Sequence, residues 1–457
     1  MASTELTRTP SSTTNRKTFT ISYWCKRSSI SSNYPRICAY DYADTDRFEH
    51  FFNNVDQMYI EHVSNNSQDV HLLTSRNFRD TSAWYHIVVA FDTTQATASN
   101  RVKLYINGVQ ETNFTGTVAY PSQDSNMIVN YAGGSVFYIG ETGYQSGGQN
   151  FDGLISHFHF IDGTAYDASA FGSTDSTTGE WKINTSPSVT YGTNGFFILK
   201  DGNSVTDSST NSNNFTVAAG TLTKSEDCPS NVFATLNPLD NYYAGGTFAN
   251  GNTKYTSVSS KHDFTVSNLA MNSGSGKFYA EFKVHQDTDY STIGISDHGY
   301  QGSNQELSED NYSYAYYNYG SDSAVRANGS NVLTSMPDFG NGDIIGVAVD
   351  LENHKLYFSK NGTFINSGDP TSGSTGTGAV SIQDLSSVTS SYGQGVYFFA
   401  VGLWHGSYSG SYSANFGNGY FGTTAVSSAG TNASGLGIFE YDVPTGYTAL
   451  CTKGLNE

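Results

Sequence analysis

The residues best suited to chemistry are aromatic side chains gathered in two stretches of the second half. Asn311 to Gly320 reads N-Y-S-Y-A-Y-Y-N-Y-G, and Leu403 to Tyr412 reads L-W-H-G-S-Y-S-G-S-Y. Aromatic rings stack on the apolar faces of sugars, while Asn, Ser and His direct hydrogen bonds to hydroxyl groups. The candidate ligand-binding residues are therefore Tyr314, Tyr316, Tyr317, Tyr319, Trp404, His405, Tyr408 and Tyr412. A Tyr-rich surface suits a sandwich core or a subunit contact equally well, so that alternative stays open.

Strand periodicity divides the first stretch into two rows. Tyr312, Tyr314 and Tyr316 fall on one face of an extended chain, and Tyr317 and Tyr319 fall on the other. Both rows cannot lie in one core. We therefore expect one row to be at least partly exposed unless a partner covers it.

Familiar catalytic patterns are absent. Retaining glycoside hydrolysis on a strand needs a Glu-x-Asp-x-x-Glu run, which the sequence does not contain. There is also no G-x-S-x-G elbow, no H-E-x-x-H and no Walker loop, and the one G-x-G-x-x-G, at residues 417–422, lacks a βαβ context. The sequence favours a protein that is not an enzyme, and a hydrolase with an unfamiliar acid pair remains the weakest alternative.

Histidine and cysteine positions do not indicate a metal site. His157 and His159 alternate on a strand, and one face of a solvent-exposed strand explains them more simply than a pair of ligands. Cys25, Cys38, Cys228 and Cys451 form no C-x-x-C pair. We expect buried free thiols rather than zinc or a disulfide framework.

Composition and charge exclude several classes of partner. Only 14% of residues are charged, the formal net charge is −19, and no basic stripe is present. Nucleic acid and anionic membranes are therefore poor partners. The N-terminus lacks the apolar segment of a signal peptide, and no run approaches the ~20 apolar residues of a membrane span. We expect synthesis in a cytoplasm.

The elements that must position these residues are β-strands built on a repeated plan. Ile344 to Asp350 is followed by a polar turn, the K-L-Y strand from Lys355 and the Asn361-Gly362 pair. The same order runs from Ile87 to Val109, with Asn107-Gly108 at its end. Asn-Gly after an alternating run is a strong hairpin signal, because a type I′ turn needs positive φ at both central residues. The plan predicts two antiparallel sandwiches with scaffold roles for both hairpins.

The first half resembles the laminin-G-like, concanavalin-type jelly roll. The resemblance is carried by the motifs Phe19–Arg27, Trp84–Asp92, Val102–Gly108, Tyr138–Gly140 and Phe151–Gly163. It implies that calcium ligands could lie near strand ends, which makes Asp92, Asp152 and Asp162 weak calcium candidates. Asp also bonds its own backbone in turns, and this plainer role is favoured for each. Otherwise no cofactor is expected.

The second half resembles a SPRY domain. The matching motifs are Gly276–Phe282, Ile293–Ile295, Phe339–Asp350, Leu356–Gly362, Tyr397–Val401, Asn415–Gly417 and Pro444–Tyr447. The chain departs from that pattern in Gly/Ser-rich insertions at 367–389 and 417–437, which we expect to be long loops. The predicted fold is all-β, with two antiparallel β-sandwich (jelly-roll, concanavalin-like) domains in tandem. The predicted boundaries are 1–225, a linker at 226–241, and 242–457.

Tandem lectin-like sandwiches without a signal peptide resemble virion fibre or decoration proteins of tailed phages. This resemblance implies a non-enzymatic virion surface protein, made in the host cytoplasm, that binds host or environmental glycans. It also implies other virion proteins as partners, a homo-oligomer and a cell-surface polysaccharide ligand. The alternative is a purely architectural capsid or tail component whose aromatic surfaces form subunit contacts.

Overall fold

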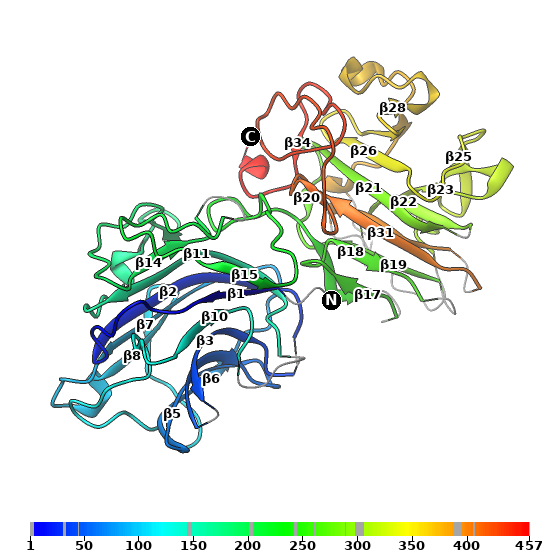
Figure 1. The fold of residues 1–457 in the computed structure, drawn as a ribbon. Helices are drawn as coiled ribbons and strands as arrows, with labels where there is room; N and C mark the ends of the chain where they lie inside the picture. The colour runs from blue at the N-terminus through cyan, green and yellow to red at the C-terminus, as the bar shows by residue number, and fades with distance from the viewer. Residues whose placement is uncertain are drawn as a thin grey trace. The chain divides into compact units, whose positions relative to one another are not determined.

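The structure is a computed structural model, and the chain divides into two compact units, residues 1–224 and 225–457 (Figure 1). It describes residues 4–30, 33–43, 45–143, 149–200, 204–241, 245–258, 262–287, 289–297, 306–387, 395–404 and 407–456. Nearly all regular structure is antiparallel strand, joined by loops and short 3-10 turns. Within these ranges no helix is long and apolar enough to cross a membrane. The predicted all-β fold of antiparallel sandwiches is confirmed.

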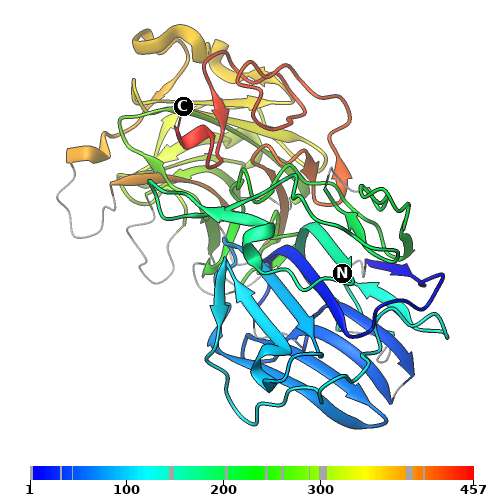
Figure 2. The same ribbon diagram turned by 90° about the vertical axis from the view of Figure 1, so that its left-hand side faces the viewer.

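Unit 1 is a sandwich of two sheets facing each other across one core (Figures 1 and 2). The seven-stranded sheet has the order β15 (Thr216–Ala219), β1 (Glu5–Arg8), β10 (Val136–Ile139), β3 (Arg36–Ala43), β4 (Asp46–Phe52), β5 (Gln57–Ser64) and β6 (Ser67–Asn77). The six-stranded sheet has the order β14 (Phe196–Ile198), β11 (Gly153–Asp162), β2 (Thr18–Arg27), β7 (Trp84–Asp92), β8 (Val102–Ile106) and β9 (Val109–Glu111).

Alternation along the strands fills this core. On β2, Phe19, Ile21, Tyr23 and Cys25 point inward, as the sequence pattern predicted. The N-terminal arm is part of the sheet, because β1 pairs with both β10 and β15. Cys25 and Cys38 are buried free thiols, as expected.

Unit 2 is a second sandwich. Its eight-stranded sheet has the order β16 (Leu236–Asn241), β19 (Asp263–Ser267), β30 (Val396–Leu403), β22 (Ser291–Ser296), β23 (Ser313–Tyr317), β24 (Ala324–Ala327) and β25 (Ser330–Leu333), with β20 (Met271–Asn272) also on β30. Its nine-stranded sheet has the order β17 (Thr247–Ala249), β18 (Lys254–Thr256), β31 (Gly410–Asn415), β21 (Lys277–Asp287), β26 (Ile344–Asp350), β27 (Lys355–Lys360) and β28 (Thr363–Phe364), with β29 (Val380–Ser381) on β27 and β34 (Thr448–Ala449) on β21.

Both predicted hairpins are present. Asn107 and Gly108 have φ of 47° and 82°, and Asn361 and Gly362 have φ of 50° and 80°. These left-handed pairs are what a type I′ turn requires. In each unit the turn follows two paired strands, β7 with β8 and β26 with β27. The repeated sequence plan is therefore a repeated piece of structure.

The predicted linker and the two predicted insertions contain regular structure. The stretch 226–241, predicted as a linker, includes β16, and Leu236 packs in the core of unit 2. The insertion at 367–389 holds a 3-10 turn at Pro370–Thr375 and the strand β29. The insertion at 417–437 holds the small hairpin of β32 (Tyr420–Phe421) and β33 (Thr424–Ala425). The predicted domain boundaries themselves remain predictions.

The expectation that His157 and His159 lie on an exposed strand face is wrong. Both are buried on the outer face of β11, where His159 stacks at 3.9 Å on Phe197 and bonds Tyr191 at 2.9 Å. The hairpin of β12 (Gly172–Thr174) and β13 (Trp181–Ile183) lies on this same side of unit 1, with Trp181 against His86. The spacing of two residues correctly predicted that both histidines lie on one face of the strand. It could not predict that residues later in the chain cover that face.

Candidate functional site: an aromatic cluster in unit 2

The strand β23 separates the predicted aromatic residues into core and surface. Tyr314 and Tyr316 are buried, the first accepting a 3.0 Å bond from the Gln383 amide and the second donating to the Pro337 carbonyl. Tyr412 is fully buried and donates to the Gly402 carbonyl at 3.1 Å. These three rings face the inner layer of the sandwich and their hydroxyl groups have internal partners. They cannot belong to a surface site, which corrects that part of the prediction.

The other row, Tyr317 and Tyr319, belongs to a partly exposed cluster. Tyr317, Tyr319, Trp404 and Tyr408 gather around Tyr290, and these five side chains are called the aromatic cluster below. The Tyr290 ring lies 4.4 Å from Tyr408, 4.7 Å from Tyr319, 4.8 Å from Trp404 and 6.0 Å from Tyr317, centroid to centroid. Tyr319 is 40% exposed, Trp404 and Tyr408 are half-buried, and Tyr317 is buried. His405 lies outside the described residues.

The central residue, Tyr290, has an unusual backbone. Asp289 and Tyr290 have φ of 82° and 69°, a region that side chains with a Cβ rarely enter. Two backbone bonds hold this turn, from the Tyr290 amide to Asn318 O at 2.8 Å and from the Trp404 amide to Tyr290 O at 2.9 Å. Strain held by its surroundings is common at binding sites. Here the left-handed backbone places the Tyr290 ring among the other four rings of the aromatic cluster.

A cation lies among the rings. Arg326 on β24 places its guanidinium carbon 5.1 Å from the Tyr317 ring centroid and 5.6 Å from that of Trp404. Its Nη1 is 2.8 Å from Glu306 Oε1, and its Nη2 donates to Gly329 O at 3.1 Å. Cation–π contact and these polar partners fix the guanidinium beneath the rings.

The charge balance around Arg326 is uneven. Burial raises the pKa of the Glu306 carboxyl group to about 8, a rise that Arg326 partly opposes. With a pKa of about 8, Glu306 is mostly protonated near neutral pH and offsets little of the charge of Arg326, while Glu309 is a second carboxyl group that interacts with this arginine. Arg326 is also the only arginine in residues 102–457. Its uniqueness in this part of the sequence is the signal from which this part of the site could have been predicted.

Tyr290 was missed for a different reason. In the sequence it follows D-T-D and precedes β22, with nothing in type or spacing to set it apart from other Tyr residues. Its left-handed backbone depends on partners in two distant segments, Asn318 and Trp404. Local pattern cannot reveal such a position.

The three calcium candidates have ordinary structural contacts. Asp92 accepts bonds from the Thr94 amide at 3.1 Å and from Gln95 Nε2 at 2.6 Å. Asp162 accepts from Asn130 Nδ2 at 2.9 Å and from the Asn194 amide at 3.0 Å. Burial raises the pKa of Asp152. Over the described ranges, no three or more His, Cys, Asp or Glu side chains come together as metal ligands would.

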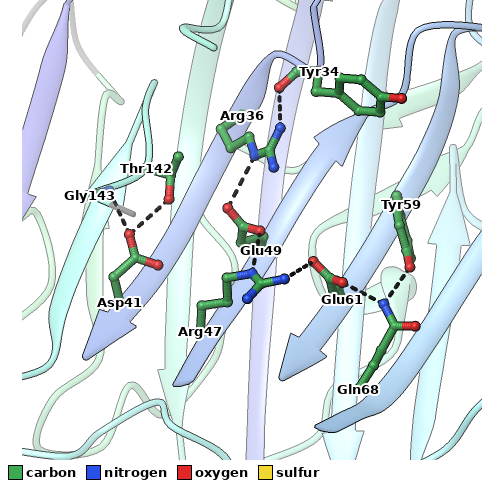
Figure 3. A network of polar contacts seen from close by, with 10 residues as sticks. All are labelled: Tyr34, Arg36, Asp41, Arg47, Glu49, Tyr59, Glu61, Gln68, Thr142 and Gly143. Atoms are coloured by element: carbon green, nitrogen blue, oxygen red, sulfur yellow. Dashed lines mark hydrogen bonds and ion pairs between the residues drawn. The ribbon is translucent and has the colours of Figure 1, made fainter. Parts of the chain in front are cut away.

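Unit 1 carries a second group of polar side chains, drawn in Figure 3. It crosses the outer face of β3 to β6 and consists of Arg36, Arg47, Glu49, Tyr59, Glu61 and Gln68. Glu49 lies directly opposite Glu61 in the strand pairing, and Arg47 contacts both carboxyl groups.

Comparison with known families identifies both units. Residues 2–170 match the family model described as the concanavalin A-like lectin/glucanases superfamily, and residues 277–380 match the SPRY domain. The first segment is therefore similar to laminin-G-like, concanavalin-type domains and the second to SPRY domains. Domains of these two types are typically binding modules without catalytic activity, which points to a binding function.

Three solved structures are similar to parts of the chain. The SPRY domain of human HERC1 matches at 15% identity over 39% of this chain and 96% of its own, with a TM-score of 0.29. The TRIM65 PSpry domain matches at 11% identity over 40% and 91%, with a TM-score of 0.27. A heptameric SAP-like pentraxin from Limulus polyphemus matches at 16% identity over 36% and 72%, with a TM-score of 0.26. A comparison with curated proteins found no match.

Proposed function

We propose that the protein is a non-enzymatic surface protein of a virion and that it binds glycans through the aromatic cluster of its SPRY domain. The observation that carries this proposal is the cluster itself, in which four of the eight predicted residues meet around Tyr290. Its rings offer apolar faces for stacking on sugar rings, and its phenol groups offer hydrogen bonds.

The cluster is suited to binding because contacts within the protein hold several of its side chains in place. Tyr290 is held by two backbone bonds, and Arg326 is fixed against Tyr317 and Trp404. A surface that is already ordered loses little conformational entropy on binding. Rigid aromatic side chains therefore give contact area at small entropic cost.

The virion assignment rests on the resemblance of tandem lectin-like sandwiches to phage fibre and decoration proteins. Binding partners would be other virion proteins, further copies of this chain and a cell-surface polysaccharide. Such a protein would be synthesised in the host cytoplasm and would bind its ligand outside the cell, as part of the released particle.

A glycan array tests the ligand. The full chain should be retained by at least one glycan, and Trp404→Ala and Tyr319→Ala should each lower retention by about tenfold or more, as for an interface anchor. Tyr420→Ala, a change to a half-buried tyrosine of the same unit, is the matched control and should leave retention unchanged. A wild-type chain that binds no glycan would overturn the proposal.

The second candidate is an architectural component of the particle. The exposed Tyr319 and the half-buried Trp404 favour it, because both types are enriched in subunit contacts. A density map of the assembled particle separates the two functions. The architectural function places the aromatic cluster against a neighbouring subunit, and the adhesion function leaves it facing solvent.

A further inference from the structure

A long loop covers the outer face of the six-stranded sheet in unit 1. It leaves the sheet after β11, carries the hairpin of β12 and β13, and returns before β14, and residues 163–192 are called the cover below. Gly163 and Gly192 at its two ends have φ of 101° and 71°. A Cβ at Gly192 would overlap the Asp162 carbonyl oxygen. Two glycines with a left-handed backbone therefore turn the chain off the sheet and back onto it.

The cover has a small apolar cluster of its own. Ala168 and Phe171 of the cover are buried against Val88 and Ile161 of the sheet. Half-buried side chains complete this cluster: Tyr105, Tyr166, Ala170, Trp181, Val189 and Tyr191. All of these residues lie outside the core that holds the two sheets together. Opening the cover would therefore leave that core packed, as in the local unfolding of one cooperative segment.

Three buried histidines lie beneath the cover, His86 on β7 and His157 and His159 on β11. The Nδ1 atom of His86 accepts a hydrogen bond of 3.0 Å from Trp181 Nε1, at the start of β13. The Nδ1 atom of His159 lies 2.9 Å from the hydroxyl group of Tyr191, near the end of the cover. Two of the three imidazole rings therefore bond directly to the cover.

Protonation of these histidines would weaken the hold of the cover. Nδ1 of His86 accepts from Trp181 only while it carries no proton, because the indole nitrogen is a donor and never an acceptor. Burial lowers the pKa of both His86 and His159, and repulsion from His157 lowers both further. The closed cover therefore favours neutral rings at all three positions.

The charged groups around the histidines do not offset a proton. The acidic side chains on this side of unit 1 have partners of their own or are exposed: Asp92 with Thr94 and Gln95, Asp167 with Ser169, Asp175 with Lys182, and the exposed Glu180. The other charged or ionisable groups are bases and phenols: Lys26 on β2, Lys103 and Tyr105 on β8, Lys200 after β14, and Tyr166 on the cover. A charged histidine is therefore better solvated once the cover has opened.

We propose that the cover is an acid-operated device, which detaches from the sheet as one segment while the two sheets of unit 1 stay packed together. The trigger is the group of three histidines, which take up protons from water when the cover opens. Opening exposes the apolar outer face of the sheet, with Trp24, Val88 and Phe197. The device does not depend on glycan binding by unit 2.

The size of the effect follows from the titration of histidine. A ring that is neutral in the closed form, and has a pKa of ~6.5 in the open form, destabilises the closed form as the pH falls below that value. Between pH 7.5 and pH 5.5 each such ring makes opening about tenfold more favourable. His86 and His159 together should therefore raise the opening equilibrium about a hundredfold.

Hydrogen exchange of the full chain, followed by mass spectrometry at both pH values and corrected for the intrinsic exchange rates, is the test. Amides bonded within the cover, such as that of Asn184 to Phe171 O at 2.9 Å, should exchange about a hundredfold faster at pH 5.5. Amides of β2 and β7 should stay more protected than those of the cover.

Variants identify the trigger. His86→Asn and His159→Asn each keep an oxygen near the position of Nδ1 but take up no proton, so each should reduce the increase to about tenfold. His50→Leu is the matched control, because His50 lies between the sheets and beside Tyr23, and it should leave the increase in the cover unchanged.

Three results would overturn the proposal. The first is exchange in the cover that does not rise in acid. The second is a cover that exchanges at the same rate as β2 and β7 at pH 5.5, since unit 1 would then unfold as a whole. The third is a full hundredfold rise in both His86→Asn and His159→Asn.

Discussion

The histidines whose pKa burial lowers most lie in unit 1, whereas the carboxyl groups whose pKa burial raises most lie in unit 2. His50, His86 and His159 are fully or almost fully inaccessible in unit 1, and Asp263, Glu281 and Glu306 are similarly buried in unit 2. Burial disfavours the charged form of either group, so it lowers the pKa of a histidine and raises that of a carboxyl group. We therefore expect the two sandwiches, which share a plan, to respond to acid in opposite directions.

In unit 1, burial lowers the pKa of His50 and of His86 to about 3, and that of His159 falls well below its usual value. His86 accepts at Nδ1 from Trp181 Nε1 at 3.0 Å, which fits a neutral ring. The unfolded chain binds protons at these histidines below pH ~6.5 while the folded chain does not. Stability is therefore fully present above that pH and is lost as the pH falls below it.

In unit 2, burial raises the pKa of Asp263 to about 6, of Glu281 to about 7 and of Glu306 to about 8. The folded chain keeps these protons at a pH where the unfolded chain has released them. Stability is then greatest at low pH and falls as the pH rises from about 4.5 through these values. Mild acid should therefore strengthen unit 2 while it weakens unit 1.

The largest expected effect is the loss of stability of unit 1 between about pH 7.5 and pH 5. Each buried histidine should cost about 2 kcal/mol over that interval, so three should cost several kcal/mol. Differential scanning calorimetry of the full chain measures this loss. Phe19→Ala weakens the core of unit 1 and Phe399→Ala weakens the core of unit 2, so the unfolding transition that each variant lowers belongs to that unit. A unit 1 transition that does not fall in acid would contradict the comparison.

Replacing one of these histidines should weaken the pH dependence. His50 lies between the sheets, with its Nδ1 3.3 Å from the Tyr23 hydroxyl. His50→Leu removes one titrating group, so unit 1 should lose about 2 kcal/mol less over the same pH interval. Calorimetry at both pH values gives the difference. An unchanged slope would mean that His50 does not titrate as its burial implies.

A gain of similar size is expected for unit 2 on the same change of pH. Its transition should rise by an amount corresponding to about 1–3 kcal/mol for each buried carboxyl group. Glu281 accepts at 2.9 Å from the amides of both Glu440 and Tyr441. Glu281→Gln should remove part of the gain. It should also lower the stability of unit 2, because the two backbone amides bond to different carboxylate oxygens and the glutamine side chain has only one oxygen to accept them. A transition that falls in acid would remove the contrast between the units.

The smallest effect concerns Arg326. Removing one partner of a buried pair usually costs several kcal/mol because the other charge is left alone. Glu306 is protonated near neutral pH, so Arg326→Met should cost unit 2 only about 1 kcal/mol there. Chemical unfolding at about pH 7 measures it, and a cost of several kcal/mol would show that Glu306 is charged.

The parts of the account that depend on local pattern were predictable. Asn-Gly pairs located both hairpins, and alternation located the inward row of β2 and the two rows of β23. Alternation could not say which row of β23 faces the core, because both are aromatic. The core-facing row is determined by tertiary packing, in which Phe339 and Phe358 contact Tyr316.

The long-range parts were not predictable. Glu49 and Glu61 are unremarkable in the sequence, and only the register of β4 against β5 places them opposite each other. The position of Tyr290 depends on Asn318 and Trp404, which are far along the chain. Sites built from cross-strand register and loop-to-loop contact need three-dimensional information.

The central claim is that a glycan contacts the aromatic cluster, and the four tryptophans offer a direct measurement. Trp24, Trp84 and Trp181 lie in unit 1 and Trp404 alone lies in unit 2. In the full chain labelled with 5-fluorotryptophan, Trp404→Phe assigns one fluorine NMR signal. Titration with a glycan that retains the chain on an array should shift the Trp404 signal and leave the other three unchanged. A bound glycan that leaves the Trp404 signal unmoved would contradict the account.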